Sequence, residues 1–409
     1  MKNKKIKVII LSGYGLNCEE ETKFAFEWAG AKKNVCADIV HINDLIKKPK
    51  MLLEYQILVF PGGFSYGDDT GSGKAYANKF KNHLAKELAE VIIPKINQII
   101  KEIDYLAKKY NKLPMLARTH GQPASPTTFG KEFKVFSERL KKQLDKLKEQ
   151  KISVKFSGAT GNFNAHLVAF PKIDWIKFAK NFIEKLNVKR IIKLELNFPT
   201  TQIDPHDSEV EIFDTLRRIN TILIDFNQDI WRYISDEWIV QKPADGTVGS
   251  STMPHKINPI KFENSEGNLG MANSFFEFFA RKLPISRLQR DLSDSTVERN
   301  FGSALAYCLV AYEYLLKGLA RISVDENKVK QDLNNYPEVI TEAIQTILRR
   351  EGVKMPYEKL KELTRGKQVT LKDIHNFIKS LEISDKIKKE LLKITPENYI
   401  GLASKIASI

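Results

Sequence analysis

The sequence predicts a mainly α-helical protein preceded by a short α/β segment. Apolar residues recur at three- and four-residue spacing over long stretches, notably 92–106 and 212–234, as they do on one face of an amphipathic helix. Before residue 84, short β-rich runs flank one helical pattern, which indicates a parallel sheet. The chain therefore divides into two unlike parts, a truncated α/β segment and a long-helix bundle.

The α/β part is expected to contain three buried strands and one helix. The strands are predicted over 7–11, 37–40 and 56–60, and the helix over 19–29. A Gly-rich turn follows the last strand, and ligands of open α/β sheets bind at the carboxyl ends of strands. The two parts join without a Gly/Ser/Pro tether, inside an expected helix near 80–90.

The helical part shows further helical patterns over 268–281, 300–320 and 372–406. The expected domains are a truncated α/β segment at 1–84, a central helical bundle at 85–340 and a small helical domain at 341–409.

Composition limits the class of protein. The 409-residue chain has a net charge of +15, but its lysines are spread over helix faces, so a nucleic-acid partner is not expected. No apolar run approaches the roughly 20 residues that span a bilayer. Its three cysteines, Cys18, Cys36 and Cys308, are too few and scattered for a disulfide framework or a zinc site. A reducing cytoplasm is the expected compartment.

Two motifs carry candidate chemistry. The run 249–259, Gly-Ser-Ser-Thr-Met-Pro-His-Lys-Ile-Asn-Pro, predicts a mobile loop with a defined exit, because Gly frees the backbone and Pro stiffens it. The run 118–124, Arg-Thr-His-Gly-Gln-Pro-Ala, is expected at the end of a helix. From spacing alone, His120 fits either a structural histidine, in the core or capping a helix, or a proton donor.

The run 249–259 resembles the signature loop of the fumarase/aspartase superfamily. Together with Phe-Glu-Asn-Ser-Glu-Gly-Asn at 262–268, it is similar to the adenylosuccinate lyase family, and the runs 118–124, 157–166, 200–207, 286–299 and 356–366 match that family as well. The resemblance covers 85–409. It implies a homotetrameric cytoplasmic enzyme without metal or organic cofactor. Such an enzyme releases fumarate from adenylosuccinate, giving AMP, and from the succinylated aminoimidazole carboxamide ribotide of purine biosynthesis.

The resemblance also implies site residues. His120 is the expected general acid and Ser250 the base, with Ser251 as the alternate. A serine acts as a base only where its surroundings favour the alkoxide. The expected substrate-binding residues are Thr119, Gln202, Lys256, Asn258 and Asn264, with Arg290, Ser295 and Arg299 on the 5′-phosphate. Alternatively, these arginines pair with neighbouring carboxylates at 291, 294 and 298. His206 is expected to be structural.

The N-terminal part resembles a second purine enzyme. Residues 11–22 and 60–84 are similar to the glutamine amidotransferase subunit of phosphoribosylformylglycinamidine synthase, of the class I amidotransferase type. The elbow cysteine and His/Glu pair of that family do not occur in this chain, and Cys18 lies beside three glutamates, which disfavour a thiolate. Glutamine hydrolysis is therefore not expected.

The lyase resemblance also implies an N-terminal helical domain with an Asn-His-Asp and a Thr-Ser-Glu-Asp string. Neither string occurs in 1–84. The active site is therefore expected to lack one wall. The alternative function is a catalytically incomplete chimeric subunit that co-assembles with an intact lyase.

Overall fold

The computed structural model describes residues 6–13, 16, 18–29, 35–61, 88–188, 190, 192–242, 256–353, 360–361 and 369–409. The chain separates into two compact units, each assembled from three stretches of sequence. The first contains 1–94, 147–214 and 274–306, and the second contains 95–146, 215–273 and 307–409.

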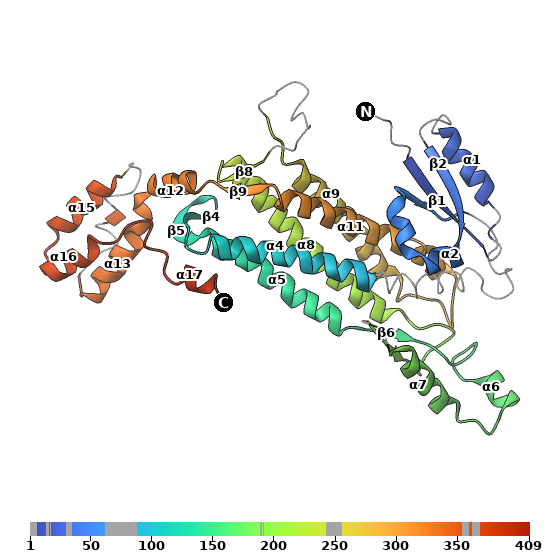
Figure 1. The fold of residues 1–409 in the computed structure, drawn as a ribbon. Coiled ribbons are helices and arrows are strands. Elements are labelled where there is room, and N and C mark those ends of the chain that lie inside the picture. Colours follow the sequence, from blue (N-terminus) through green and yellow to red (C-terminus); the bar gives the residue numbers. More distant parts are fainter. Residues whose placement is uncertain are drawn as a thin grey trace. The chain divides into compact units, whose positions relative to one another are not determined.

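The N-terminal segment is a three-stranded parallel sheet with the strand order β2-β1-β3 (Figure 1). Val8 and Ile10 of β1 pack against Phe26, whereas Ile9 and Leu11 pack against Leu45, so helices cover both faces of the central strand. The predicted parallel sheet is confirmed. Its elements are β1 (Ile6–Ser12), α1 (Glu19–Ala29), β2 (Val35–His41), α2 (Ile42–Lys47), the 3-10 helix η1 (Pro49–Glu54) and β3 (Ile57–Val59).

Long helices dominate the rest of the described chain, which confirms the mainly α fold class. Their apolar stripes are buried as the spacing predicts, with Ile96, Ile103, Ile219 and Leu223 fully shielded from solvent. The predicted helix near 80–90 lies largely outside the described residues, which resume with the π-helical turn η3 (Leu88–Ile92). The long helices are α4 (Ile93–Lys109), α5 (Phe129–Glu149), α8 (Asp207–Ser235), α9 (Ile260–Lys282) and α11 (Phe301–Leu319).

Among the described residues, short strands form three two-stranded sheets besides the N-terminal one. In the first unit, β6 (Lys151–Val154) and β7 (Lys193–Leu196) are parallel, and α6 (Asn164–Ala169) and α7 (Trp175–Leu186) lie between them in sequence. In the second unit, two antiparallel pairs form, β4 (Pro114–Thr119) with β5 (Gln122–Thr128) and β8 (Ile239–Gln241) with β9 (Ile322–Val324).

The C-terminal region consists of short helices. The helical pattern predicted over 372–406 is divided among three helices. Leu381 is extended, and the Ser384 side chain accepts a hydrogen bond from the Ile387 N–H, so a new helix begins there. The elements of this region are α12 (Glu326–Asn334), the 3-10 helix η4 (Pro337–Ile340), α13 (Thr341–Arg350), α15 (Leu371–Ser380), α16 (Asp385–Leu391) and α17 (Ala403–Ile406).

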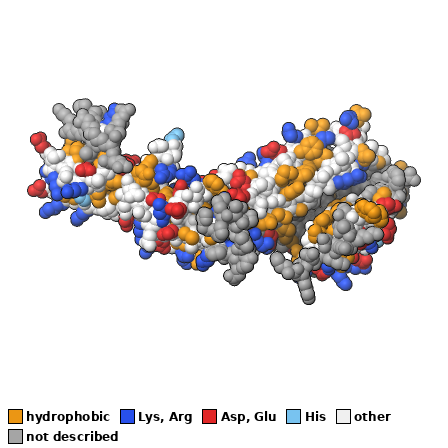
Figure 2. Space-filling model, turned by 90° about the horizontal axis from the view of Figure 1, so that it is seen from above, with side chains coloured by type: hydrophobic (Ala, Val, Ile, Leu, Met, Phe, Trp, Pro, Cys, Tyr) orange, Lys and Arg blue, Asp and Glu red, His pale blue; other side chains and the backbone are white. Residues whose placement is uncertain are grey.

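The surface carries charges of both signs. Figure 2 shows lysine and arginine interspersed with aspartate and glutamate over the described part of one face, without a continuous basic stripe there. Among the described helices, none combines the length and apolarity needed to cross a membrane.

Candidate functional site

His120 lies at the tip of the β4–β5 hairpin in the second unit. The expectation that it ends a helix was wrong, because α4 ends at Lys109 and Pro114 begins a strand. His120 and Gly121 have φ angles of 52° and 74°. Two consecutive left-handed residues form the type I′ turn, whose twist matches that of paired strands.

The hairpin holds the His120 side chain in solvent. The Arg118 guanidinium donates to the Gly121 carbonyl at 3.3 Å and lies over the Tyr336 ring at 5.6 Å. Thr119 pairs with Gln122 in the ladder. Both Thr119 and His120 are exposed. An exposed imidazole on a braced turn can exchange protons with a bound molecule.

Lys256 and Asn258 lie just before α9, also in the second unit. Ser250 and Ser251 lie outside the described residues. The Gln241 side chain at the end of β8 donates to the Ile257 carbonyl at 3.0 Å. This bond fixes the backbone between Lys256 and Asn258, so the exit of the signature loop is anchored to the β8–β9 pair.

Asn264 lies near the start of α9, with its side chain exposed. Its flanking residues fix this part of α9 to α8. The Trp231 indole donates to Glu263 at 3.1 Å, and the buried Asn227 amide donates to the Ser265 hydroxyl at 3.0 Å. Across the described part of this unit, no hydrogen bond or ion pair joins His120 to Lys256 or Asn264.

Gln202 and Arg290 are neighbours in the first unit. The Gln202 N–H donates to the Gln289 carbonyl at 3.2 Å. Gln202 also lines a cavity of about 400 Å³, whose walls include Lys155, Arg190 and several apolar side chains of α7 and β6. Gln202 and Gln289, which are 87 residues apart in sequence, are thus side by side.

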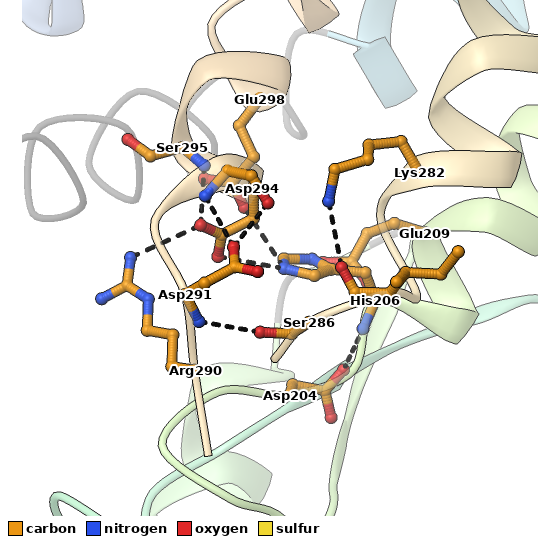
Figure 3. A network of polar contacts seen from close by, with 12 residues as sticks. Asp204, His206, Glu209, Lys282, Ser286, Arg290, Asp291, Asp294, Ser295 and Glu298 are labelled. Carbon is orange, nitrogen blue, oxygen red and sulfur yellow. Dashed lines mark hydrogen bonds and ion pairs between the residues drawn. The ribbon is translucent and has the colours of Figure 1, made fainter. Parts of the chain in front are cut away.

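Asp294, on α10 (Ser293–Glu298), links two predicted phosphate-binding residues (Figure 3). Its Oδ1 accepts the Ser295 N–H at 2.7 Å and lies 3.6 Å from Arg290 Nη2. The alternative that the arginines pair with nearby carboxylates therefore holds for Arg290. Within the described chain, the buried Arg290 Nε has no hydrogen-bond acceptor. Arg299, immediately after α10, is exposed.

His206 is the centre of this cluster, and its position was not evident from the sequence. Its left-handed backbone, with φ 65°, turns a buried imidazole toward three buried carboxylates. Nδ1 lies 3.8 Å from Glu209, and Nε2 lies 3.7 Å from both Asp294 and Glu298. The only sequence signal was a histidine between Pro205 and an acidic helix start.

The carboxyl groups around His206 differ in acidity. Burial alone would raise the pKa of Asp294, but the nearby His206 imidazole and the charge of Arg290 lower it on balance. Burial raises the pKa of Asp204, against the opposing hydrogen bond from Asn197. In the described part of the chain, no group of three or more His, Cys, Asp or Glu side chains is arranged so that it could hold a metal ion.

Comparison with known proteins decides the family. The adenylosuccinate lyase of Haemophilus influenzae is 50% identical over 317 residues, which are 78% of this chain and 68% of that protein. That of Legionella pneumophila (strain Corby) is 48% identical over 332 residues, 81% of this chain and 71% of that protein.

The chain belongs to the adenylosuccinate lyase family. The family model "Adenylosuccinate lyase C-terminal" matches residues 286–400, and the model "Lyase" matches 75–273. The chain is therefore a lyase, as predicted. The adenylosuccinate lyase of Escherichia coli K12 is 48% identical over 314 residues, 77% of this chain and 68% of that protein.

The adenylosuccinate lyase fold is also found in a solved structure. The 3-carboxy-cis,cis-muconate lactonizing enzyme from Pseudomonas putida has a TM-score of 0.64 with 21% identity, covering 82% of this chain and 75% of that one. The N-terminal part matches the "CobB/CobQ-like glutamine amidotransferase domain" over 5–107. The predicted fusion is confirmed, and the two matches overlap over 75–107.

Proposed function

We propose that this chain carries out the adenylosuccinate lyase reaction of purine biosynthesis in the cytoplasm, as a homotetramer. It releases fumarate from adenylosuccinate, giving AMP, and from the succinylated aminoimidazole carboxamide ribotide. The observation that carries the proposal is the 50% identity to the Haemophilus influenzae enzyme over 317 residues. All the residues to which we assign chemistry lie within 85–409.

The elimination needs a base and an acid. Ser250, or in its place Ser251, removes a proton from the carbon next to a succinyl carboxylate. The electrons of that bond form the fumarate double bond, the carbon–nitrogen bond breaks, and His120 protonates the leaving nitrogen. The exposure of His120 on a braced hairpin supports its role as the acid.

The substrate needs groups that hold its carboxylates and its base. A lysine ammonium and asparagine amides bind carboxylates, and a glutamine amide can both donate to and accept from a purine edge. We assign these contacts to Lys256, Asn258, Asn264 and Thr119, and to Gln202 for the purine or succinyl group. The anchor from Gln241 to the Ile257 carbonyl supports this assignment, because it limits the motion of the two flanking residues.

The 5′-phosphate is assigned to Arg290, Ser295 and Arg299. Arginine binds phosphate oxygens through several charge-assisted hydrogen bonds. The buried Arg290 Nε supports the assignment, because a phosphate oxygen would satisfy a donor that has no acceptor in the described chain.

Fumarate release from adenylosuccinate, followed by ultraviolet absorbance, tests the proposal. Ser250→Ala should reduce kcat by about 10²-fold or more, and His120→Gln by a similar factor. Ser251→Ala is the matched control, since it removes the neighbouring hydroxyl. If Ser251→Ala abolishes turnover and Ser250→Ala does not, Ser251 is the base. Full activity in both serine variants would refute the loop as the source of the base.

The second candidate is a catalytically incomplete subunit. It is favoured by the fact that the chain matches 68% of the Haemophilus influenzae enzyme and that 1–84 lacks the two strings expected of a lyase. Such a subunit would co-assemble with an intact lyase through the helices of 85–340. Mixing the two chains and measuring particle mass and activity separates the candidates: mixed tetramers with reduced activity support the subunit, and independent turnover supports the enzyme. Glutaminase activity would be the sign of an amidotransferase, for which the chain has no elbow cysteine.

A further inference from the structure

His206 is a buried titratable side chain that the proposed mechanism does not use. It is 6% exposed and lies between the start of α8, which carries Glu209, and α10, which carries Asp294 and Glu298. All three carboxylate side chains are themselves at most 8% exposed. Figure 3 shows the imidazole pointing into this group of acids.

The two ring nitrogens face acceptors on both sides. Nδ1 is 3.8 Å from Glu209 Oε1, and Nε2 is 3.7 Å from Asp294 Oδ2 and from Glu298 Oε1. A neutral imidazole has one N–H and one lone pair, so one nitrogen would turn a lone pair toward a buried carboxylate. Only the imidazolium has two donors. The geometry therefore favours the charged form.

Other charged groups lie near His206. The turn before α8 contributes Asp204, and the cavity wall next to His206 contributes Lys155 and Arg190. The Arg290 guanidinium lies 3.6 Å from Asp294. An imidazolium at His206 places a positive charge within 3.8 Å of Glu209, Asp294 and Glu298, and such pairing stabilises buried carboxylates.

The charge on His206 bears on the predicted phosphate site through Asp294. One oxygen of this carboxylate, Oδ2, faces His206, and the other, Oδ1, faces Arg290 and the Ser295 N–H. Holding Oδ2 therefore fixes the orientation of Oδ1. That oxygen in turn fixes the Arg290 side chain and the first turn of α10.

We infer that His206 is a positioning residue held as an imidazolium, which aligns Asp294 so that Arg290 and Ser295 present their donors to the 5′-phosphate of a nucleotide. This inference rests on the proposed phosphate role of Arg290 and Ser295. His206 does not touch the reacting atoms, and its effect is on phosphate recognition.

The test is binding of AMP and of adenosine to the full chain, measured by calorimetry. His206→Gln should weaken AMP binding about tenfold, because the donors of the phosphate site lose their alignment. It should leave adenosine binding unchanged. His206→Lys, which keeps the charge, should restore part of the AMP affinity. His375→Gln, a histidine of α15 in the other unit, is the matched control and should change neither affinity.

Several results would overturn the inference. One is that His206→Gln loses AMP and adenosine affinity equally, as it would if the substitution disrupted the fold in general. Another is that His206→Gln loses no affinity for AMP. A further result comes from the native chain and needs no variant to fold. Histidine NMR at about pH 7.5, where free imidazole side chains are neutral, would overturn the inference if it showed a neutral His206 ring. A native chain that binds adenosine and AMP equally would instead refute the phosphate site itself, and His206 positioning with it.

Discussion

Two buried polar clusters of this molecule differ in kind. In the second unit, the Tyr312 hydroxyl donates to Asn220 Oδ1 at 2.8 Å, and the Asn220 amide donates to Asn273 at 3.0 Å and to Cys308 Sγ at 3.3 Å. In the first unit, His206 contacts its carboxylates only at 3.7–3.8 Å. The first cluster is neutral with short hydrogen bonds, and the second is ionic with longer separations.

The difference corresponds to two roles: the neutral cluster packs helices together, and the ionic cluster lies next to the predicted phosphate site. Neutral groups joined by short bonds fix the register of α8, α9 and α11 and do not change with pH in the physiological range. Burial raises the pKa of the Cys308 thiol to about 12, despite the hydrogen bond from Asn220, so it stays protonated. The ionic cluster depends on the protonation of its members, and it borders the predicted phosphate site. Charge is therefore found where a charged substrate is expected.

Asp294→Ala should have the largest effect on stability. It removes the carboxylate shared by His206, Arg290 and the Ser295 N–H, and breaking a buried ion pair costs about 3 kcal/mol of unfolding free energy. Urea denaturation measures this loss. The control is Glu195→Ala, which breaks an exposed pair with Lys151 in the same unit and should cost less than about 1 kcal/mol. Equal losses would contradict the ionic description of the cluster.

Tyr312→Phe tests the neutral cluster. It leaves the buried Asn220 Oδ1 without its donor, at a cost of about 2 kcal/mol. The loss should be the same at about pH 6 and pH 8, because no member of the cluster titrates between them. Tyr314→Phe, two residues along the same helix and only partly buried, should have little effect. A loss that changes with pH would show that the neutral cluster is coupled to a titrating group.

Gly161→Ala tests the close packing between Gly161 and the segment that leads to Gln202, near the ionic cluster. Gly161 has φ 85°, and an added Cβ would collide with the Thr200 carbonyl, in the segment that leads to Gln202. The combined strain and displacement should cost about 1–2 kcal/mol. Gly302→Ala, where the added carbon meets open space on α11, should be neutral or slightly stabilising. Similar thermal midpoints for both variants would contradict the close packing at Gly161.

Asp229→Asn should have the smallest effect, and the opposite sign. Burial, with the charges of Asp225 and Glu132, raises the pKa of Asp229 to about 6. The folded chain thus keeps a proton that the unfolded chain releases at about pH 4, and folding is penalised as the pH rises through this interval. The asparagine removes the penalty, so the gain should be about 1 kcal/mol at pH 8, after allowance for partial exposure, and near zero at pH 4.

Chemical denaturation at the two pH values measures the Asp229 effect. The control is Asp236→Asn, which breaks the exposed pair with Arg232 just beyond the same helix. It should not show a gain that grows with pH. A stabilisation by Asp229→Asn that is equal at both pH values would contradict the raised pKa.

The long helices could be predicted because their signal is distributed over many residues. Ile96, Ile99 and Ile103 repeat the same spacing, and each repetition adds to the evidence for one buried face. The β4–β5 hairpin could not be predicted in this way. Its strands carry proline and threonine without strict alternation, and its turn places a histidine in the left-handed region, where asparagine and glycine are more usual.

Part of the candidate site could likewise be predicted from the sequence, and part could not. The motifs around Gln202, Arg290 and Ser295 could be recognised from the sequence. The sequence did not reveal the hydrogen bond between Gln202 and Gln289. It also did not reveal that Asp294 contacts both Arg290 and Ser295. The function of Ser250 rests on the sequence alone, since that residue lies outside the described part of the chain.

The sequence by itself determined the family, the reaction class and the division into an amidotransferase-like segment and a lyase, because these depend on runs of residues contiguous in the chain. Only the tertiary structure decided that His206 lies among Glu209, Asp294 and Glu298. Those contacts join residues up to about 90 positions apart, and no local propensity encodes a charge balance that exists only once the segments are buried together.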